Sequence, residues 1–225
     1  IIVKLTSITF AESKDGTVTP LKLGKEVFSS NNALTSITLR EGVMSIPSKA
    51  FYRCKVLESV TVPTTVANDN NNGLRAIGVS AFEDCESLNK VIFTKGGTLP
   101  LSFAKGAFLG CTALTELNLP KRASSFNGNY DVFEFGAGDK RESELANYVF
   151  NDNPYRAGQN VTLARVNVMA DDTVPQDFAA EYASYDGALY SADLKTVVWI
   201  PYGRKGNVEI SKNATSFRDG AAYGC

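Results

Sequence analysis

The chain repeats one short template of apolar and small residues, and this repetition limits the folds it can adopt more than any other feature. The template opens as Leu-x-x-Ile-x-Leu and closes as Ala-Phe-x-x-Cys, for example at residues 50–54, 81–85 and 107–111. The leading leucine recurs at positions 34, 57, 88 and 114, in steps of 23, 31 and 26 residues. Because the template holds while the step varies, we expect insertions in the turns between the coils of a solenoid.

The pattern continues, less regularly, on both sides of these units. An earlier unit opens at Leu5 and closes at residues 27–31, a later one closes at 149–153, and residues 220–225 echo 106–111. We therefore predict one repeat domain over residues 1–225, cut from a longer array. Irregular insertions are expected at about 121–148 and 185–202, each carrying a hairpin, because short apolar runs there flank polar or glycine-containing turns.

The opening half of the template alternates apolar with polar residues and is rich in β-branched side chains, which is typical of a strand with one buried face. Strands of successive coils are expected to pair in parallel, about 4.8 Å apart. The Ala-Phe-x-x-Cys half is too short for an independent helix, so we expect a turn or a single helical turn there. The predicted fold class is α/β and strand-rich, with a parallel sheet on one face, turns or helical turns on the other, and inserted β-hairpins.

The last position of each closing segment is expected to form an inward-facing structural ladder. It holds either cysteine or asparagine, which share small size and an ability to hydrogen-bond to backbone groups. Buried free thiols, disulfides between coils and reactive nucleophiles are all open; the first is favoured, because stacked side chains are poorly aimed at each other and no basic cluster activates them. The ladder residues are Asn31, Cys54, Cys85, Cys111, Asn153 and Cys225.

Composition argues against several classes of function. The absence of histidine removes Ser-His-Asp and Cys-His catalysis, and a formal net charge of −1 gives no positive field for nucleic acid. No apolar run approaches the ~20 residues of a membrane span. The loop 68–73 resembles a calcium loop, but its twelfth position is Val79, where a carboxylate is needed. We expect a monomer that is not an enzyme, with no cofactor, metal, nucleic-acid partner or membrane span.

On these residues the chain resembles the BspA-like leucine-rich repeat proteins. Residues 34–120 match the family's unit closely, residues 5–33 match in outline, and residues 186–201 are similar to the Asp-Gly-x-Leu-Tyr linker between blocks of repeats. The resemblance implies a leucine-rich repeat solenoid that is secreted or attached to the bacterial surface and acts as an adhesin. It supplies no catalytic residues, and a fold does not fix a function.

Outward-pointing strand positions are the candidate binding face, because a solenoid aligns them into one extended concave surface. An ordinary solvated face is the alternative for each of them. Two aromatic residues, Trp199 and Tyr202, are further candidates as anchors, with packing in the hairpin core as the alternative. The strand candidates are Ser36, Thr38, Arg40, Ser59, Thr61, Lys90, Ile92, Glu116 and Asn118.

Three functions are compatible with this sequence. The first is a cell-surface recognition module that binds an extracellular protein or glycan along the strand face. The second is a structural spacer or accessory domain of a larger secreted protein. The third is part of an enzyme whose catalytic domain lies outside these residues. We favour the first, because repeat arrays bind ligands along extended surfaces.

Overall fold

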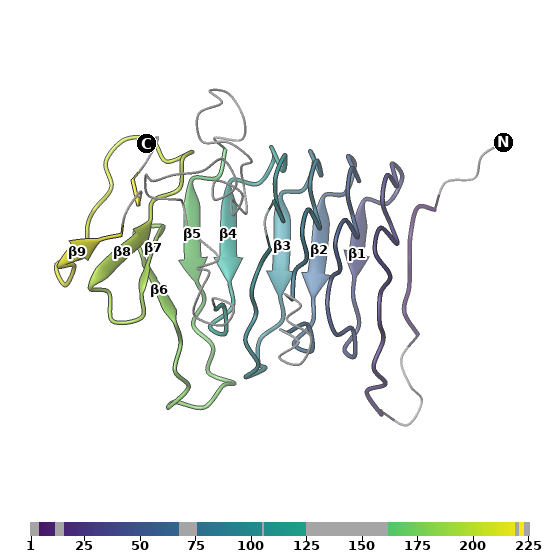
Figure 1. Ribbon diagram of the computed structural model, residues 1–225, viewed down its shortest axis with the longest axis horizontal. Coiled ribbons are helices and arrows are strands. Elements are labelled where there is room, and N and C mark those ends of the chain that lie inside the picture. The colour runs from purple at the N-terminus through teal and green to yellow at the C-terminus, as the bar shows by residue number, and fades with distance from the viewer. Residues whose placement is uncertain are drawn as a thin grey trace, which may run out of the picture.

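The computed structural model describes residues 5–11, 16–67, 76–104, 106–124, 162–218 and 221–222, and these contain strands but no helix. The described residues therefore include no helix that could cross a membrane. Figure 1 shows β1 to β5 side by side along the long axis, with β6 to β9 at one end. The strands are β1 (Ser36–Thr38), β2 (Ser59–Val62), β3 (Lys90–Phe93), β4 (Glu116–Leu119), β5 (Arg165–Val168), β6 (Tyr182–Tyr185), β7 (Ala188–Ser191), β8 (Thr196–Trp199) and β9 (Ser216–Phe217).

The repeats pair through parallel strands, as the alternating sequence predicts. β1, β2 and β3 form one sheet in which equivalent positions face each other: Ile37 pairs with Val60, and Val60 with Val91. β4 and β5 pair in parallel in the same way. Because strand side chains alternate between faces, this register buries the apolar residue of every coil and turns its polar neighbours outward.

The Ala-Phe-x-x-Cys segments adopt the turn alternative, and two left-handed residues explain why no helical turn forms. In the segment 50–54, Lys49 lies directly before the first residue and Arg53 is the fourth residue, and each has φ of 56°. Alternate backbone N–H groups donate to the next coil: the N–H of Phe51 donates to Ala81 O and that of Arg53 to Glu83 O, both at 2.8 Å. Hydrogen bonds to the next coil thus replace the i→i−4 bonds of a helix. Equivalent left-handed positions are Glu26, Ser30, Ser80, Asp84, Gly106 and Gly110.

One hydrophobic core runs through the stacked coils. It extends from Leu34 in the first described strand unit to Trp199 in β8. On the turn side, the phenylalanines of four successive units stack ring on ring, with centroids 5.0, 5.1 and 5.3 Å apart. Each coil buries its apolar residues against its neighbours, so the stability of one coil depends on the next. The stacked rings are Phe28, Phe51, Phe82 and Phe108.

The structure contains a hairpin within 185–202. β7 pairs antiparallel with β8 there, β6 pairs antiparallel with β7, and β9 adds to β8 in parallel. Asp186, in the turn between β6 and β7, ties this sheet to β5: it lies 3.7 Å from Nη1 of Arg165 and also pairs with Arg204. The backbone N–H of Glu209 and the Arg204 guanidinium hold the pKa of Asp186 below its ordinary value.

Several expectations concern residues outside the described ranges. In the region 121–148, where a hairpin is expected, residues 125–148 lie outside the described ranges. The whole loop 68–73 also lies outside them. The ladder positions Asn153 and Cys225 also lie outside the described residues.

Candidate functional site

The strand residues expected to point outward do lie on one face of the parallel strands. Two rows cross β1, β2 and β3 in register: Ser36, Ser59 and Lys90 form one, and Thr38, Thr61 and Ile92 form the other. Ile92 is 37% exposed, which makes it an apolar position on a polar face. β4 lies beside β3 and continues the face with exposed Glu116 and half-buried Asn118.

Two polar residues of β5 complete this face, and the sequence interpretation missed them. Arg165 pairs in register with Glu116, and Asn167 with Asn118. The Nδ2 group of Asn167 donates to Glu116 Oε1 and to Asn118 Oδ1, both at 3.0 Å. The alternation of polar and valine residues over 165–168 could have indicated this strand. The pattern follows a long stretch of sequence that does not match the template.

A pocket of about 360 Å³ opens on this face where β1, β2 and β3 end. Its floor and far wall come from the strand ends, and its near wall is the segment 16–18, which precedes the first strand. Sequence reasoning named Thr38, Arg40 and Thr61, but it missed the near wall, because that segment has no match to the template. The lining residues are Gly16, Thr17, Val18, Thr38, Leu39, Arg40, Glu41, Thr61, Pro63 and Thr94.

Arg40 carries the positive charge of the pocket, and backbone carbonyls hold it in place. Its Nη1 group donates to Thr19 O at 3.1 Å and to Glu41 O at 2.8 Å. The Glu41 carboxylate is committed elsewhere, since it accepts from the backbone N–H and hydroxyl of Thr64 and from the N–H of Thr65, at 2.8–3.2 Å. Among the described residues, Arg40 therefore has no carboxylate partner.

Gly42 allows the near wall to approach the strand ends. It has φ of 96°, and a Cβ there would lie 2.3 Å from Thr19 O and 2.9 Å from Nη1 of Arg40. The wall is also held by the N–H of Leu21, which donates to Gly42 O at 2.7 Å. A side chain at position 42 would push residue 19 away, and the pocket would lose its shape.

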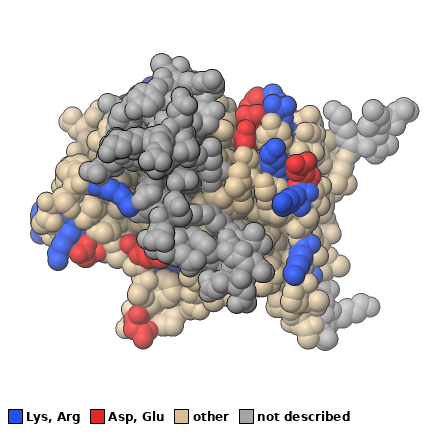
Figure 2. Space-filling view, viewed as in Figure 1, with Lys and Arg blue, Asp and Glu red and all other residues tan. Residues whose placement is uncertain are grey.

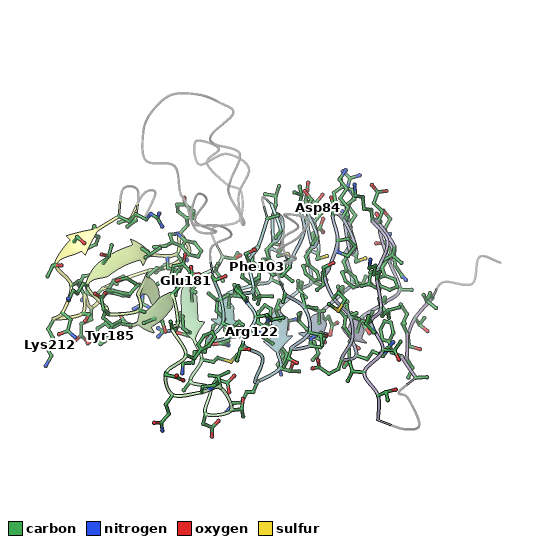
Figure 3. All side chains as sticks on the ribbon, turned by 60° about the horizontal axis from the view of Figure 1, so that its bottom comes forward. Asp84, Phe103, Arg122, Glu181, Tyr185 and Lys212 are labelled. Carbon is green, nitrogen blue, oxygen red and sulfur yellow. The ribbon has the colours of Figure 1, made fainter. Side chains whose placement is uncertain are left out.

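A second arginine, Arg122, is buried beside the pocket residue Pro63. Arg122 is only 2% exposed. Its Nη1 group donates to Val66 O at 2.7 Å and to Leu99 O at 3.2 Å. Its Nη2 group donates to Pro63 O at 3.3 Å. Burial lowers the pKa of Arg122 to about 10, so the guanidinium is charged at neutral pH. Figure 3 shows Arg122 within the stack of coils, away from Asp84 on the turn side. Its contacts join its own segment to the turn 63–66 and to Leu99, which is a structural role.

Trp199 does not belong to the exposed face, so the expectation of an aromatic anchor there is corrected. It is 1% exposed and packs in the main core beside Leu189 and Val198. Tyr202 is half-buried and meets the Trp199 ring edge-on, with centroids 6.3 Å apart. Removing so large an apolar ring from water favours folding by about 1.5–3 kcal/mol, which explains the core position.

The described ladder positions point inward and satisfy backbone groups. The thiols of Cys54, Cys85 and Cys111 are buried and free, and each donates to a phenylalanine carbonyl of the preceding coil at 3.0–3.1 Å. Burial raises the pKa of all three thiols, so they stay protonated and unreactive near neutral pH. Asn31 works differently: its Oδ1 accepts from the N–H groups of Ala33 and Leu34.

The described residues offer no centre for metal chemistry. No group of three or more Cys, Asp or Glu side chains among them is placed to hold a metal ion. Figure 2 shows acidic and basic residues interspersed on the visible described surface, with no extended patch of one sign. The strand face therefore offers hydrogen-bonding groups, two cations with no carboxylate partner among the described residues (Arg40 and Lys90), and a pocket.

Comparison with known proteins identifies the repeats. A family model described as BspA type leucine-rich repeat region matches residues 21–130 in six copies. No curated protein matches the chain. The structure is similar to the crystal structure of the pneumococcal vaccine antigen PcpA, with a TM-score of 0.50 and 18% identity over 94% of this chain and 45% of that one.

A second solved structure, a leucine-rich repeat protein from Eubacterium ventriosum, matches with a TM-score of 0.39 and 17% identity over 85% of this chain and 52% of that one. The chain thus spans only about half the length of either protein. At 18% identity, the likeness to PcpA shows a shared fold alone.

Proposed function

We propose that this chain is a non-catalytic, adhesin-like recognition module. It belongs to the BspA-type leucine-rich repeat family through residues 21–130. Its ligand is an extracellular protein or glycan, bound along the outward face of β1 to β5. The observation that supports the proposal is the register of that face, because equivalent positions of successive coils place mostly polar side chains in rows across β1 to β3 and across β4 and β5. Rows of this kind form the binding surfaces of repeat solenoids.

An extracellular or cell-surface location fits this function. The pneumococcal protein of similar fold is a vaccine antigen, which supports display outside the cell. The absence of histidine from the whole sequence supports a role without catalysis that depends on histidine. A monomer is sufficient, because a single chain supplies both rows and the pocket beside them.

The test is a binding screen against extracellular matrix proteins and glycans. The key variant reverses the charges of the strand face with Arg40→Glu, Lys90→Glu and Glu116→Lys, and we expect it to lose saturable binding. The matched control carries Lys55→Glu, Glu86→Lys and Lys212→Glu, which changes the net charge equally; Lys55 and Glu86 form an ion pair on the turn side. Both variants should unfold at the midpoint of the parent chain. Equal binding by the two variants would contradict the proposal.

The alternative is a structural spacer or accessory part of a larger secreted protein. The turn-side hydrogen bonds and the continuous phenylalanine stack favour it, because they join every described coil from residue 26 to residue 111 into one stiff body. Absence of binding to every ligand on the screen would support this alternative.

A further inference from the structure

We propose that the pocket at the ends of β1, β2 and β3 is a subsite for a carboxylate-bearing saccharide. This inference rests on the proposed recognition function and specifies its ligand. Three properties of the pocket lead to it: a guanidinium with no carboxylate partner among the described residues, the hydroxyls of Thr38 and Thr61, and a location over the face of the sheet.

The guanidinium of Arg40 is oriented but has no carboxylate partner among the described residues. Both acceptors of its Nη1 group are neutral backbone carbonyls, and the carboxylate of the adjacent residue, Glu41, is occupied by Thr64 and Thr65. These contacts leave Nε and Nη2 for a ligand. A planar guanidinium binds a carboxylate through two parallel N–H···O bonds, so a carboxylate is the group that fits this position.

The threonines beside Arg40 provide groups that fit sugar hydroxyls. Thr38 and Thr61 face each other in register on β1 and β2, and neither hydroxyl has a hydrogen-bond partner among the described residues. Thr94 follows β3 and donates to Val62 O at 3.3 Å, which leaves its oxygen able to accept. A hydroxyl can donate and accept at once, as can each hydroxyl of a saccharide.

The location favours a saccharide over an extended peptide. A peptide that adds a strand needs the free backbone groups of a sheet edge. Here the backbone groups under the pocket are already paired between coils; for example, the N–H of Leu39 donates to Thr61 O at 3.1 Å. The strand backbone is therefore not free to pair with a peptide, and Arg40 and the threonines supply the polar side chains for recognition. The volume of about 360 Å³ lies within the range of small-ligand sites, about 300–1,000 Å³.

The experiment follows the backbone amide and threonine methyl NMR signals of the whole chain during titration with three probes. These are a tetrasaccharide containing glucuronate, the same tetrasaccharide with its carboxylates reduced to alcohols, and a short peptide with a free C-terminal carboxylate. We expect the acidic saccharide to shift signals of Thr38, Thr61 and Thr94, and the reduced form to bind about 10-fold or more weakly. Equal affinities for the two saccharides, or binding of the peptide alone, would overturn the proposal.

Two variants assign the effect to the pocket. Arg40→Gln should weaken binding of the acidic saccharide about 10- to 100-fold, because it removes a charge-assisted pair. Thr61→Val, which removes a hydroxyl without a protein partner, should weaken it about 2- to 10-fold with no loss of thermal stability. Arg53→Gln on the turn side is the matched control and should bind like the parent chain. Unchanged affinity in both pocket variants would overturn the proposal.

A variant with only Lys90→Glu and Glu116→Lys separates this inference from the proposed function. One outcome is that this variant loses binding to a ligand from the screen while the acidic saccharide fails to bind the parent chain. In that case the proposed binding along the strand face is supported, and the assignment of the pocket to a saccharide is wrong. If neither the screen nor the saccharide gives binding, both proposals are wrong.

Discussion

The thiol of Cys85 donates a hydrogen bond to the carbonyl oxygen of Phe51, one coil earlier, at 3.0 Å. The N–H of Phe51 in turn donates to Ala81 O in the coil of Cys85, so the two coils are joined in both directions. Cys54 and Cys111 make the same bond to their own preceding coils. The cysteine column is thus a structural link between coils, and its energetics can be measured.

The buried thiols predict a loss of stability at alkaline pH. Burial raises the pKa of Cys85 and Cys111 far above the ordinary value of 9.0. The unfolded chain therefore releases these protons first, and the stabilisation, complete below pH 9, is lost as the pH rises. Urea unfolding should show a decrease of about 1 kcal/mol per buried thiol between pH 9 and pH 10. A variant with serine at positions 54, 85 and 111 should show a correspondingly smaller decrease; an identical one would contradict this explanation.

The left-handed positions predict substitutions with effects of different size. Gly110 has φ of 75°, and a Cβ there would lie 2.9 Å from the backbone nitrogen of Asp84. Gly110→Ala should therefore reduce the free energy of unfolding by about 1–3 kcal/mol. Ser80 already adopts φ of 54° with a side chain, so Ser80→Gly relieves strain while adding freedom to the unfolded chain, and its net effect should stay below about 1 kcal/mol. Urea unfolding of both variants measures the difference; a larger loss at Ser80 would contradict it.

The buried Arg122 predicts that charge alone cannot replace a guanidinium. Its Nη1 and Nη2 groups bind the carbonyls of Pro63, Val66 and Leu99, and an ammonium cannot reproduce that planar geometry. Arg122→Lys should cost about 2–4 kcal/mol in urea unfolding, because buried carbonyls lose their donors. Arg53→Lys, at an exposed ion pair with Asp84, is the control and should change stability by less than about 1 kcal/mol. Similar losses in the two variants would show that Arg122 has no special role.

Asp186 predicts a loss of stability that depends on pH in the acidic range. Its folded-state pKa lies below the ordinary value of 3.8, so its carboxylate stabilises the fold above that pH and loses this effect as the pH falls. Asp186→Asn should lower the free energy of unfolding by about 1 kcal/mol at pH 7 and by clearly less at pH 3. Asp172→Asn, at an exposed ion pair with Lys95, should have little effect at either pH. An equal loss for Asp186→Asn at both pH values would indicate a packing defect.

Much of the fold follows from local patterns in the sequence. Alternation in the opening half of each unit specifies a strand, and exact repetition brings equivalent positions such as Ile37 and Val60 into register. The outward rows, including Thr38, Thr61 and Lys90, follow from the same period. The choice between a turn and a helical turn did not follow, because propensity alone does not show that Lys49 and Arg53 take left-handed conformations. That choice depends on hydrogen bonds to the neighbouring coil.

The repeat, the parallel strands and the inward cysteine column follow from the sequence, since each arises from a period that is visible along the chain. Other features depend on contacts between distant segments of the folded chain. It buried Trp199 in the main core, set Asn167 between Glu116 and Asn118, and laid residues 16–18 beside the strand ends to close a pocket around Arg40. These contacts join segments with no common pattern. They depend on how closely two backbones approach, as at Gly42 and Thr19, and on which carbonyls are left for a guanidinium to bind.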